Sequence, residues 1–143
     1  MPETFLSADS VSIKAINDLC DSVYLISSIR DEVLTVVFGN LRINMEIRSY
    51  GEYDDFIRIW ASWRLDPEQP MLRRLGVVNT LNERYILRVL VHTWGDGSAS
   101  LIFDYSYPCS YGLHKQNFIK VLYNFRDGVT SAISQSEVAA LLA

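Results

Sequence analysis

The chain has 143 residues, 49% of them hydrophobic, and its thirteen basic and seventeen acidic side chains give a net charge of −4. This length and composition are typical of one folded domain over residues 1–143 and exclude a disordered chain. The acidic balance argues against a dedicated nucleic-acid binder, because such proteins normally carry a basic surplus.

The N-terminal segment lacks the basic and apolar regions of a secretory signal, and no apolar run approaches the roughly 18 residues of a membrane span. Cys20 and Cys109 lie far apart and neither belongs to a CxxC pair. They could form one disulfide or remain as two buried free thiols, and a reducing compartment favours the second. We therefore expect a soluble cytoplasmic protein.

The first third of the chain predicts a helix followed by strands. Apolar residues at helical spacing predict a helix over residues 10–20, with Ser10 or Asp9 as its cap. Strand character follows over residues 23–29 and 33–38, and turn residues separate the two segments.

Two later segments alternate apolar and polar residues with a period of two. Residues 41–48 do so without a break, and residues 56–64 repeat the pattern. Such alternation predicts strands of an antiparallel sheet with one buried face and one wet face. Trp63 falls in the apolar set of the second segment, so we expect it in the core.

An amphipathic helix is predicted next, starting at Asp66-Pro67, where Asp66 can cap and Pro suits the first helical position. Its apolar residues recur every third position and predict one buried stripe, formed by Leu72, Leu75, Val78 and Leu81. The helix is expected to run directly into a strand at Tyr85.

Asn79 and Asn82 lie three residues apart on this helix, although Asn is a poor helix former. They could contact a partner. The structural interpretation is favoured, in which their amides bond backbone groups of the neighbouring strand or close the helix end.

The last part of the chain predicts a hairpin and a long helix. Residues 85–94 and 98–107 read as strands joined by Gly95-Asp96-Gly97. The final helix places Phe125 on its buried face, and residues 136–143 are either a further helical turn or a frayed tail. The order helix, three or four strands, helix, two strands, helix predicts an α+β fold with an antiparallel sheet.

With this order, three segments resemble the YbjN family of bacterial proteins, whose members are described as candidate sensory transduction regulators. They are the helix end Val78-Asn79-Thr80-Leu81-Asn82-Glu83-Arg84, the strand Arg88-Val89-Leu90-Val91 with its Gly95-Asp96-Gly97 turn, and the aromatic strand Ile59-Trp60-Ala61-Ser62-Trp63-Arg64. The likeness spans residues 10–133.

The resemblance implies a fold like that of type III secretion chaperones, a twisted antiparallel sheet packed by helices, often in homodimers. It carries over no catalytic residue, because the family has none established. One departure concerns the last helix, where related sequences place Thr or Ser after a Gly-Leu pair. Here Gly112-Leu113 is followed by His114, which leaves the cap of that helix open.

Metal binding and catalysis have little support in the sequence. The two histidines, His92 and His114, lie on different elements without Cys or carboxylate at ligand spacing. A thiolate–imidazole pair of Cys109 and His114 is conceivable, but an isolated thiol near a loop is usually inert. We expect no enzyme, no cofactor and no metal.

The outer face of the sheet is the candidate site, because arginine and aromatic residues alternate there as they do in protein interfaces. The candidate interface residues are Arg58, Trp60, Arg88, Leu90 and Ile102, within a face that also includes Arg42, Arg48, Phe56, Arg64, Ile86, His92 and Trp94. A second interpretation pairs the arginines across strands with Glu46 and Asp104 and covers the Trp with a loop.

We therefore expect a non-catalytic, protein-binding regulator or chaperone-like adaptor that acts as a homodimer or with a protein client. The alternative is an RNA- or ligand-binding regulator, because an open sheet with aromatics and Arg can stack bases.

Overall fold

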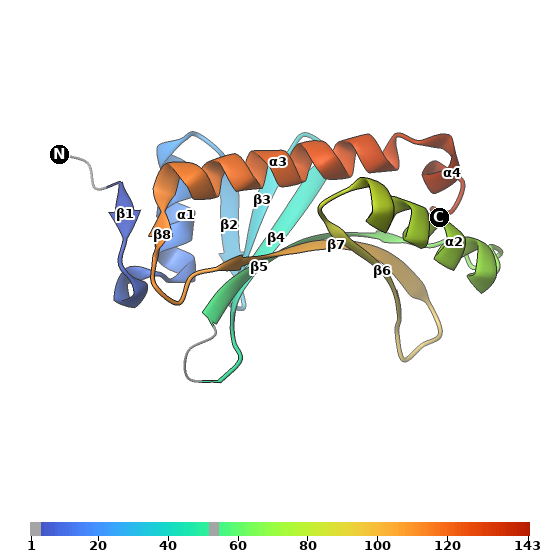
Figure 1. Ribbon diagram of the computed structural model, residues 1–143, viewed down its shortest axis with the longest axis horizontal. Helices are drawn as coiled ribbons and strands as arrows, with labels where there is room; N and C mark the ends of the chain where they lie inside the picture. Colours follow the sequence, from blue (N-terminus) through green and yellow to red (C-terminus); the bar gives the residue numbers. More distant parts are fainter. Residues whose placement is uncertain (1–3, 52–54) are drawn as a thin grey trace. The chain divides into compact units, whose positions relative to one another are not determined.

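The computed structural model describes residues 4–51 and 55–143, and it shows the α+β fold that the order of segments predicts (Figure 1). The chain runs through β1 (Phe5–Leu6), the 3-10 helix η1 (Ala8–Ser10), α1 (Ile13–Ser22), β2 (Ile26–Arg30), β3 (Val33–Phe38), β4 (Leu41–Ser49), β5 (Asp55–Arg64), α2 (Met71–Arg84), β6 (Arg88–Thr93), β7 (Ala99–Pro108), β8 (Leu113–His114), α3 (Lys115–Ile133) and α4 (Ser136–Ala139).

Six strands of the described chain are hydrogen-bonded in the order β2-β3-β4-β5-β7-β6, and β1 pairs with β8 separately. The expected neighbours β4 and β5 lie side by side in this sheet, and β6 pairs antiparallel with β7 as expected. Among the described residues no helix is long and apolar enough to cross a membrane.

The contacts between Cα atoms divide the chain into two compact units. Unit 1 comprises Met1–Ile59 and Ser106–Arg126, and unit 2 comprises Trp60–Tyr105 and Asp127–Ala143. Each unit therefore combines two separate stretches of chain. One domain over residues 1–143 stays a prediction, because this division describes contacts and not independent folding.

The first α-helix of unit 1 begins three residues later than expected. Helix α1 starts at Ile13, because Ser12 is the cap and its Oγ accepts a hydrogen bond from the Ala15 amide at 3.0 Å. Ser10 and Asp9, the predicted caps, are part of η1 instead. Strand β2 likewise begins at Ile26 and not at Val23, because the left-handed backbone of Tyr24 (φ 63°) ends the preceding turn.

The strands of unit 1 are joined by tight turns of the predicted kind. Arg30 and Val33 are paired across the β2–β3 turn, whose two central residues, Asp31 and Glu32, both have positive φ. This is the type I′ geometry that matches the twist of two-residue hairpins. In the next turn, Gly39 adopts φ 61° between paired Phe38 and Leu41.

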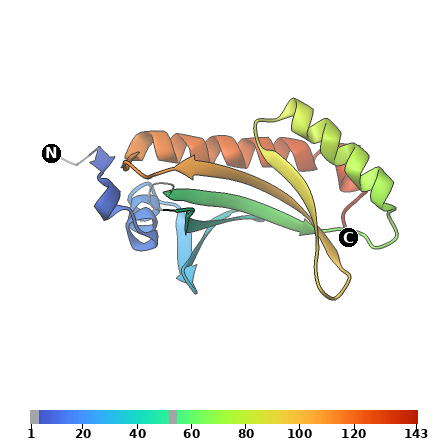
Figure 2. The same ribbon diagram turned by 60° about the horizontal axis from the view of Figure 1, so that its bottom comes forward.

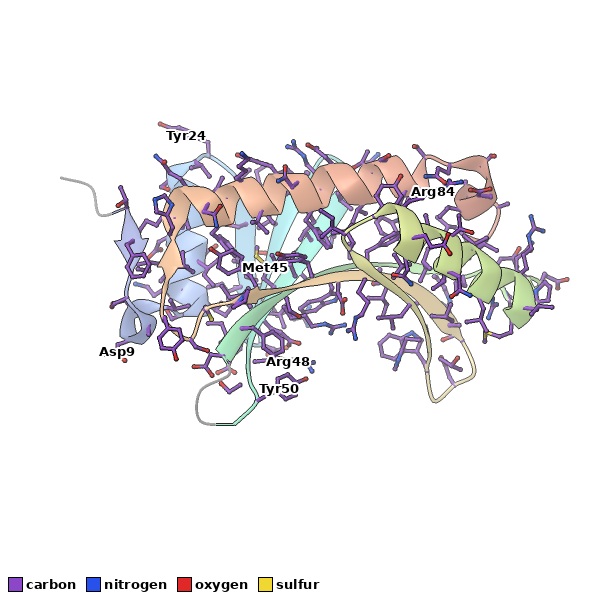
Figure 3. The ribbon with its side chains drawn as sticks, in the orientation of Figure 1. Asp9, Tyr24, Met45, Arg48, Tyr50 and Arg84 are labelled. Carbon is purple, nitrogen blue, oxygen red and sulfur yellow. The ribbon has the colours of Figure 1, made fainter. Side chains whose placement is uncertain are left out.

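Helix α1 packs on β2, β3 and β4 and closes the core of unit 1. The buried side chains alternate along the strands, as predicted for residues 41–48. They come from α1, from strands β3, β4 and β5, and from α3. They include Ile16, Leu19, Leu34, Val36, Ile43, Met45, Ile57, Ile59, Phe118, Leu122 and Phe125. Figure 3 shows Met45 inside this unit, whereas Tyr24 points outward from the turn after α1. Phe125 is a core residue, as predicted.

A short N-terminal strand covers the start of α3. Leu6 pairs with Leu113, and the Thr4 carbonyl accepts a hydrogen bond from the Lys115 amide at 2.9 Å. Gly112 makes this possible, because it has φ 97° and a Cβ there would overlap the Leu6 carbonyl oxygen. The open question of the cap is answered by His114, whose Nδ1 accepts from the Asn117 amide at 3.2 Å.

Helix α2 of unit 2 starts at Met71 and not at Asp66. Asp66 closes a turn instead, since its Oδ1 accepts from the Glu68 amide at 3.0 Å. Pro70 explains the delay, because the residue before a proline is driven out of the helical region. The segment 66–70 therefore cannot continue smoothly into the helix.

The apolar stripe predicted for α2 is wrong in its first half. Val78 and Leu81 are buried, but Leu72 is 84% exposed and Leu75 is 45% exposed, and Arg74 takes the inward position. A spacing of three falls short of a 3.6-residue turn by roughly 60° at each step. The stripe therefore winds around the helix until Leu72 and Leu81 lie on opposite sides.

The end of the chain is a packed helical turn and not a frayed tail. Val138 and Leu141 are fully buried, and Leu142 bridges to Leu65 in antiparallel fashion. The Asp66 amide donates to the Leu141 carbonyl at 2.8 Å. These bonds tie the segment after α4 into unit 2.

Candidate interaction surface

In unit 2 the pairing of β6 with β7 sorts the side chains onto two faces. Val89 is opposite Phe103 and both are buried, on the face that contacts α2. Trp63 lies on this inner face too, because its ring meets Phe103 edge-on at 5.7 Å. Trp63 is only half-buried, so the expectation of a core residue is met in part.

The outer face of unit 2 holds the side chains that alternate with these. It comprises Trp60, Ser62 and Arg64 on β5, Arg88, Leu90 and His92 on β6, and Ser100, Ile102 and Asp104 on β7. Figures 1 and 2 draw α2 on the opposite side of the β6–β7 ladder. The face is therefore formed by strands without a helix of this unit above it.

The apolar centre of the outer face is partly closed by its own side chains. Leu90 lies opposite Ile102; Leu90 is half-buried, whereas Ile102 is only 7% exposed. Trp60 is also half-buried and has an interaction partner. The outer face was expected to expose its large apolar side chains to solvent. Trp60 is only partly exposed and Ile102 is buried, so this expectation is not fully met for either residue.

The outer face also carries an ion pair between neighbouring strands. Arg88 Nε donates to Asp104 Oδ1 at 2.8 Å, and Arg88 Nη2 donates to Asp104 Oδ2 at 2.5 Å. Asp104 is 3% exposed, while the Arg88 side chain is 67% exposed. The two-pronged bond compensates the buried carboxylate and keeps the guanidinium at the surface.

Arg58 belongs to unit 1, where it lies 3.9 Å from Glu46, and Arg48 bonds the same carboxylate at 2.6 Å. The Arg58–Glu46 and Arg88–Asp104 pairs are those of the second interpretation, in which arginines pair across strands, whereas Arg48 and Glu46 lie two residues apart on β4. Figure 3 shows Arg48 beside Tyr50 at the end of β4. The bond to Glu46, followed by one to Tyr50, raises the pKa of Arg48.

Aromatic side chains mark the β6 end of the outer face. His92 and Trp94 meet edge-on with ring centroids 4.3 Å apart, and Trp94 Nε1 donates to Ser100 Oγ at 3.0 Å. Trp94 remains 49% exposed. Ile86 does not belong to this face, because β6 starts at Arg88 and not at Tyr85, and Ile86 lies in the preceding bend, 93% exposed.

The two asparagines of α2 have different environments. The Asn82 amide holds both backbone groups of Val89: its Nδ2 donates to the carbonyl at 2.9 Å, and its Oδ1 accepts from the amide at 2.8 Å. Asn79 is exposed. Asn82 is tolerated near the helix end because its side chain replaces a strand partner for Val89.

The reactive groups are held in unreactive settings. Cys20 and Cys109 are free and buried, as expected. Burial, with a smaller effect of Asp21, raises the pKa of the Cys20 thiol to about 11, and burial also raises the pKa of Cys109. Within residues 4–51 and 55–143, no three His, Cys, Asp or Glu side chains gather as metal ligands.

Comparison with known proteins identifies the fold. No family model and no curated protein matches the sequence. The structure is similar to that of Escherichia coli YbjN, described as a candidate transcription regulator, with a TM-score of 0.74 and 10% identity over 93% of this chain and 96% of that chain. It is also similar to an uncharacterized protein from Methanothermobacter thermautotrophicus, with a TM-score of 0.58 and 15% identity over 86% and 94%. The chain has a YbjN-like fold, in agreement with the resemblance in sequence.

Proposed function

We propose that this YbjN-like fold is a non-catalytic protein-binding domain that acts as a regulator or chaperone-like adaptor, with the outer face of unit 2 as its contact surface. The observation that carries the proposal is the presence of half-buried Trp60 and Leu90 on a strand face that α2 does not cover. E. coli YbjN is described as a candidate transcription regulator, which is compatible with a binding role.

The chemistry of this face suits a protein better than a small substrate. Trp and Arg are enriched among the residues that dominate protein interfaces. Leu90, Ile102 and Trp60 supply an apolar centre, and the exposed guanidinium of Arg88 lies beside it. Because Asp104 already pairs with Arg88, this arginine is held in place before a partner arrives, which lowers the entropic cost of binding.

The RNA-binding alternative has less support, because three arginines of the candidate sheet face are paired with carboxylates. Arg88 is paired with Asp104, and Arg48 and Arg58 share Glu46. Single-strand binders need a groove of net positive charge to follow the phosphates. A chain of net charge −4 with paired arginines provides little of it.

A charge placed in the apolar centre tests the proposal. Leu90→Glu should abolish the binding of proteins that the parent retains from extracts of its native cell. Leu72→Glu is the matched control, because Leu72 is more exposed but lies on α2, away from the outer face. Retention on mixed single-stranded RNA is measured in parallel at low and moderate salt.

The outcomes separate the two functions. Loss of the same proteins with Leu90→Glu and Trp60→Glu, but not with Leu72→Glu, supports the outer face. If all three variants retain the same proteins as the parent, the surface is wrong. Salt-sensitive RNA retention that Leu90→Glu removes would instead favour the nucleic-acid alternative. Thermal melts of each variant check that the fold is intact.

A further inference from the structure

The six-stranded sheet has two edge strands, β2 and β6, because each has one hydrogen-bonded neighbour in the strand order. An edge strand presents backbone N–H and C=O groups that no strand pairs, and it can recruit another chain. Natural proteins usually block such edges with lysine, proline, a bulge or a covering side chain. The two edges of this sheet differ in that respect.

The β6 edge is blocked at Val89 by α2. Both backbone groups of Val89 that would face an added strand are bonded to the Asn82 amide. An incoming strand would therefore have to displace two hydrogen bonds and the helix that carries Asn82. Strand addition at β6 is disfavoured.

The β2 edge has no comparable block among the described residues. Its sequence, Ile-Ser-Ser-Ile-Arg, contains neither lysine nor proline, and only Ser27 is not exposed. Ile26 is 72% exposed and Ile29 is 43% exposed. Helix α1 packs against β2, and the Ser27 hydroxyl donates a hydrogen bond to Asn17 Oδ1 at 2.7 Å, a contact that uses no backbone group of β2.

We propose that β2 pairs antiparallel with β2 of a second copy of this chain, which extends the sheet across a two-fold axis at Ser28. Residues that lie opposite each other in an antiparallel pair point to the same face of the sheet. A two-fold axis perpendicular to the sheet therefore requires one residue to lie opposite the same residue of the second copy. Ser28 is the central residue of the five-residue strand, so this register gives the largest overlap.

The side chains of β2 are self-complementary in this register. Ser28 faces Ser28 of the partner copy, where the two hydroxyls can bond each other, and Ile26 faces the aliphatic stem of the partner copy's Arg30. Arg30 is the one charged residue of β2, at its end and 3.9 Å from Asp31. The two-fold axis therefore places like charges at opposite ends of the strand pair, where they do not repel each other strongly.

The pairing buries exposed Ile26 and Ile29 from both copies, but one strand pair is smaller than a standard protein interface of roughly 1,600 Å². We therefore expect a weak dimer, whose fraction rises with concentration from the micromolar to the near-millimolar range. This inference does not depend on the proposed function, because β2 belongs to unit 1 and the outer face of the proposal to unit 2.

Charge complementation at Ser28 tests both the dimer and its register. Ser28→Lys and Ser28→Glu each place two like charges against each other at the axis, so each variant alone should sediment as a monomer. An equimolar mixture pairs Lys with Glu and should restore the dimer. Neither substitution touches a backbone group, and the exposed site lets both variants fold, as thermal melts will show.

Ser106→Lys is the matched control, because Ser106 is an exposed serine on β7 and should leave dimerisation as in the parent. Sedimentation velocity over the stated concentrations measures all species. We expect at least a tenfold weaker dimer for each single variant and recovery in the mixture. A parent that stays monomeric at near-millimolar concentration, or a dimer that Ser28→Lys leaves unchanged, overturns the proposal.

Discussion

Replacing Asn82 by Ala removes a side chain that bonds both backbone groups of Val89. A net hydrogen bond contributes about 1 kcal/mol, so two of them contribute about 2 kcal/mol to the free energy of unfolding. Val89 is 2% exposed, so water reaches its backbone groups poorly and the loss can approach about 3 kcal/mol. Alanine has a higher helix propensity than asparagine, which offsets about 0.5 kcal/mol of this loss in the free energy of unfolding.

Asn79→Ala is the matched control for this variant. Asn79 lies one turn earlier on α2, is exposed, and gains the same helix propensity on substitution. We expect it to be neutral or slightly stabilising. The difference between the two variants, about 2 kcal/mol, then isolates the contribution of the bonds to Val89.

Urea unfolding at a shared m-value measures this difference, and hydrogen exchange reports on the Val89 amide directly. Asn82→Asp adds a third comparison, because it keeps an acceptor for the Val89 amide and turns the donor into an oxygen that repels the Val89 carbonyl. It should destabilise at neutral pH and partly recover when the carboxyl is protonated. Equal unfolding midpoints for the two Ala variants, with unchanged protection of Val89, would refute the reasoning.

Three further predictions concern buried or constrained sites. Phe125→Ala should lower the free energy of unfolding by about 3–5 kcal/mol in urea titrations, because Phe125 is 1% exposed. Gly112→Ala should release β1 from β8, seen as faster hydrogen exchange at Leu6, because a Cβ at φ 97° overlaps the Leu6 carbonyl oxygen. Burial raises the pKa of Cys20 from 9.0 to about 11, so the folded state binds the proton more tightly and stability should fall as pH rises from 9 to 11. Cys20→Ala should flatten that slope in thermal melts, whatever its stability at neutral pH.

The strands were predictable wherever one local pattern decides the outcome. Residues 41–48 alternate without a break, and a period of two admits one assignment of faces, so Ile43 and Met45 are buried as expected. The Gly39 turn follows from the positive φ that glycine tolerates. Both features are determined by residues that are adjacent in the sequence, which is why the sequence alone predicts them.

The features that the sequence did not predict depend on groups far along the chain. The burial of Ile102 on the outer face follows from side chains of other strands, and the burial of Asp104 is possible because Arg88 lies opposite it. Arg74 faces inward on α2 because its Nη2 reaches the Asp66 carbonyl at 2.7 Å, which the helical repeat does not reveal. Register and tertiary hydrogen bonds decide these positions.

The alternation of the two units along the chain affects how the protein is made. Unit 1 needs α3, whose Tyr123 packs edge-on against Phe38 and whose Arg126 guanidinium lies 5.2 Å from the same ring. A ribosome adding roughly 5–20 residues per second delivers the intervening stretch within several seconds. During that interval the nascent α1 and β2–β4 carry an uncovered apolar surface, on which a ribosome-associated chaperone is expected to act.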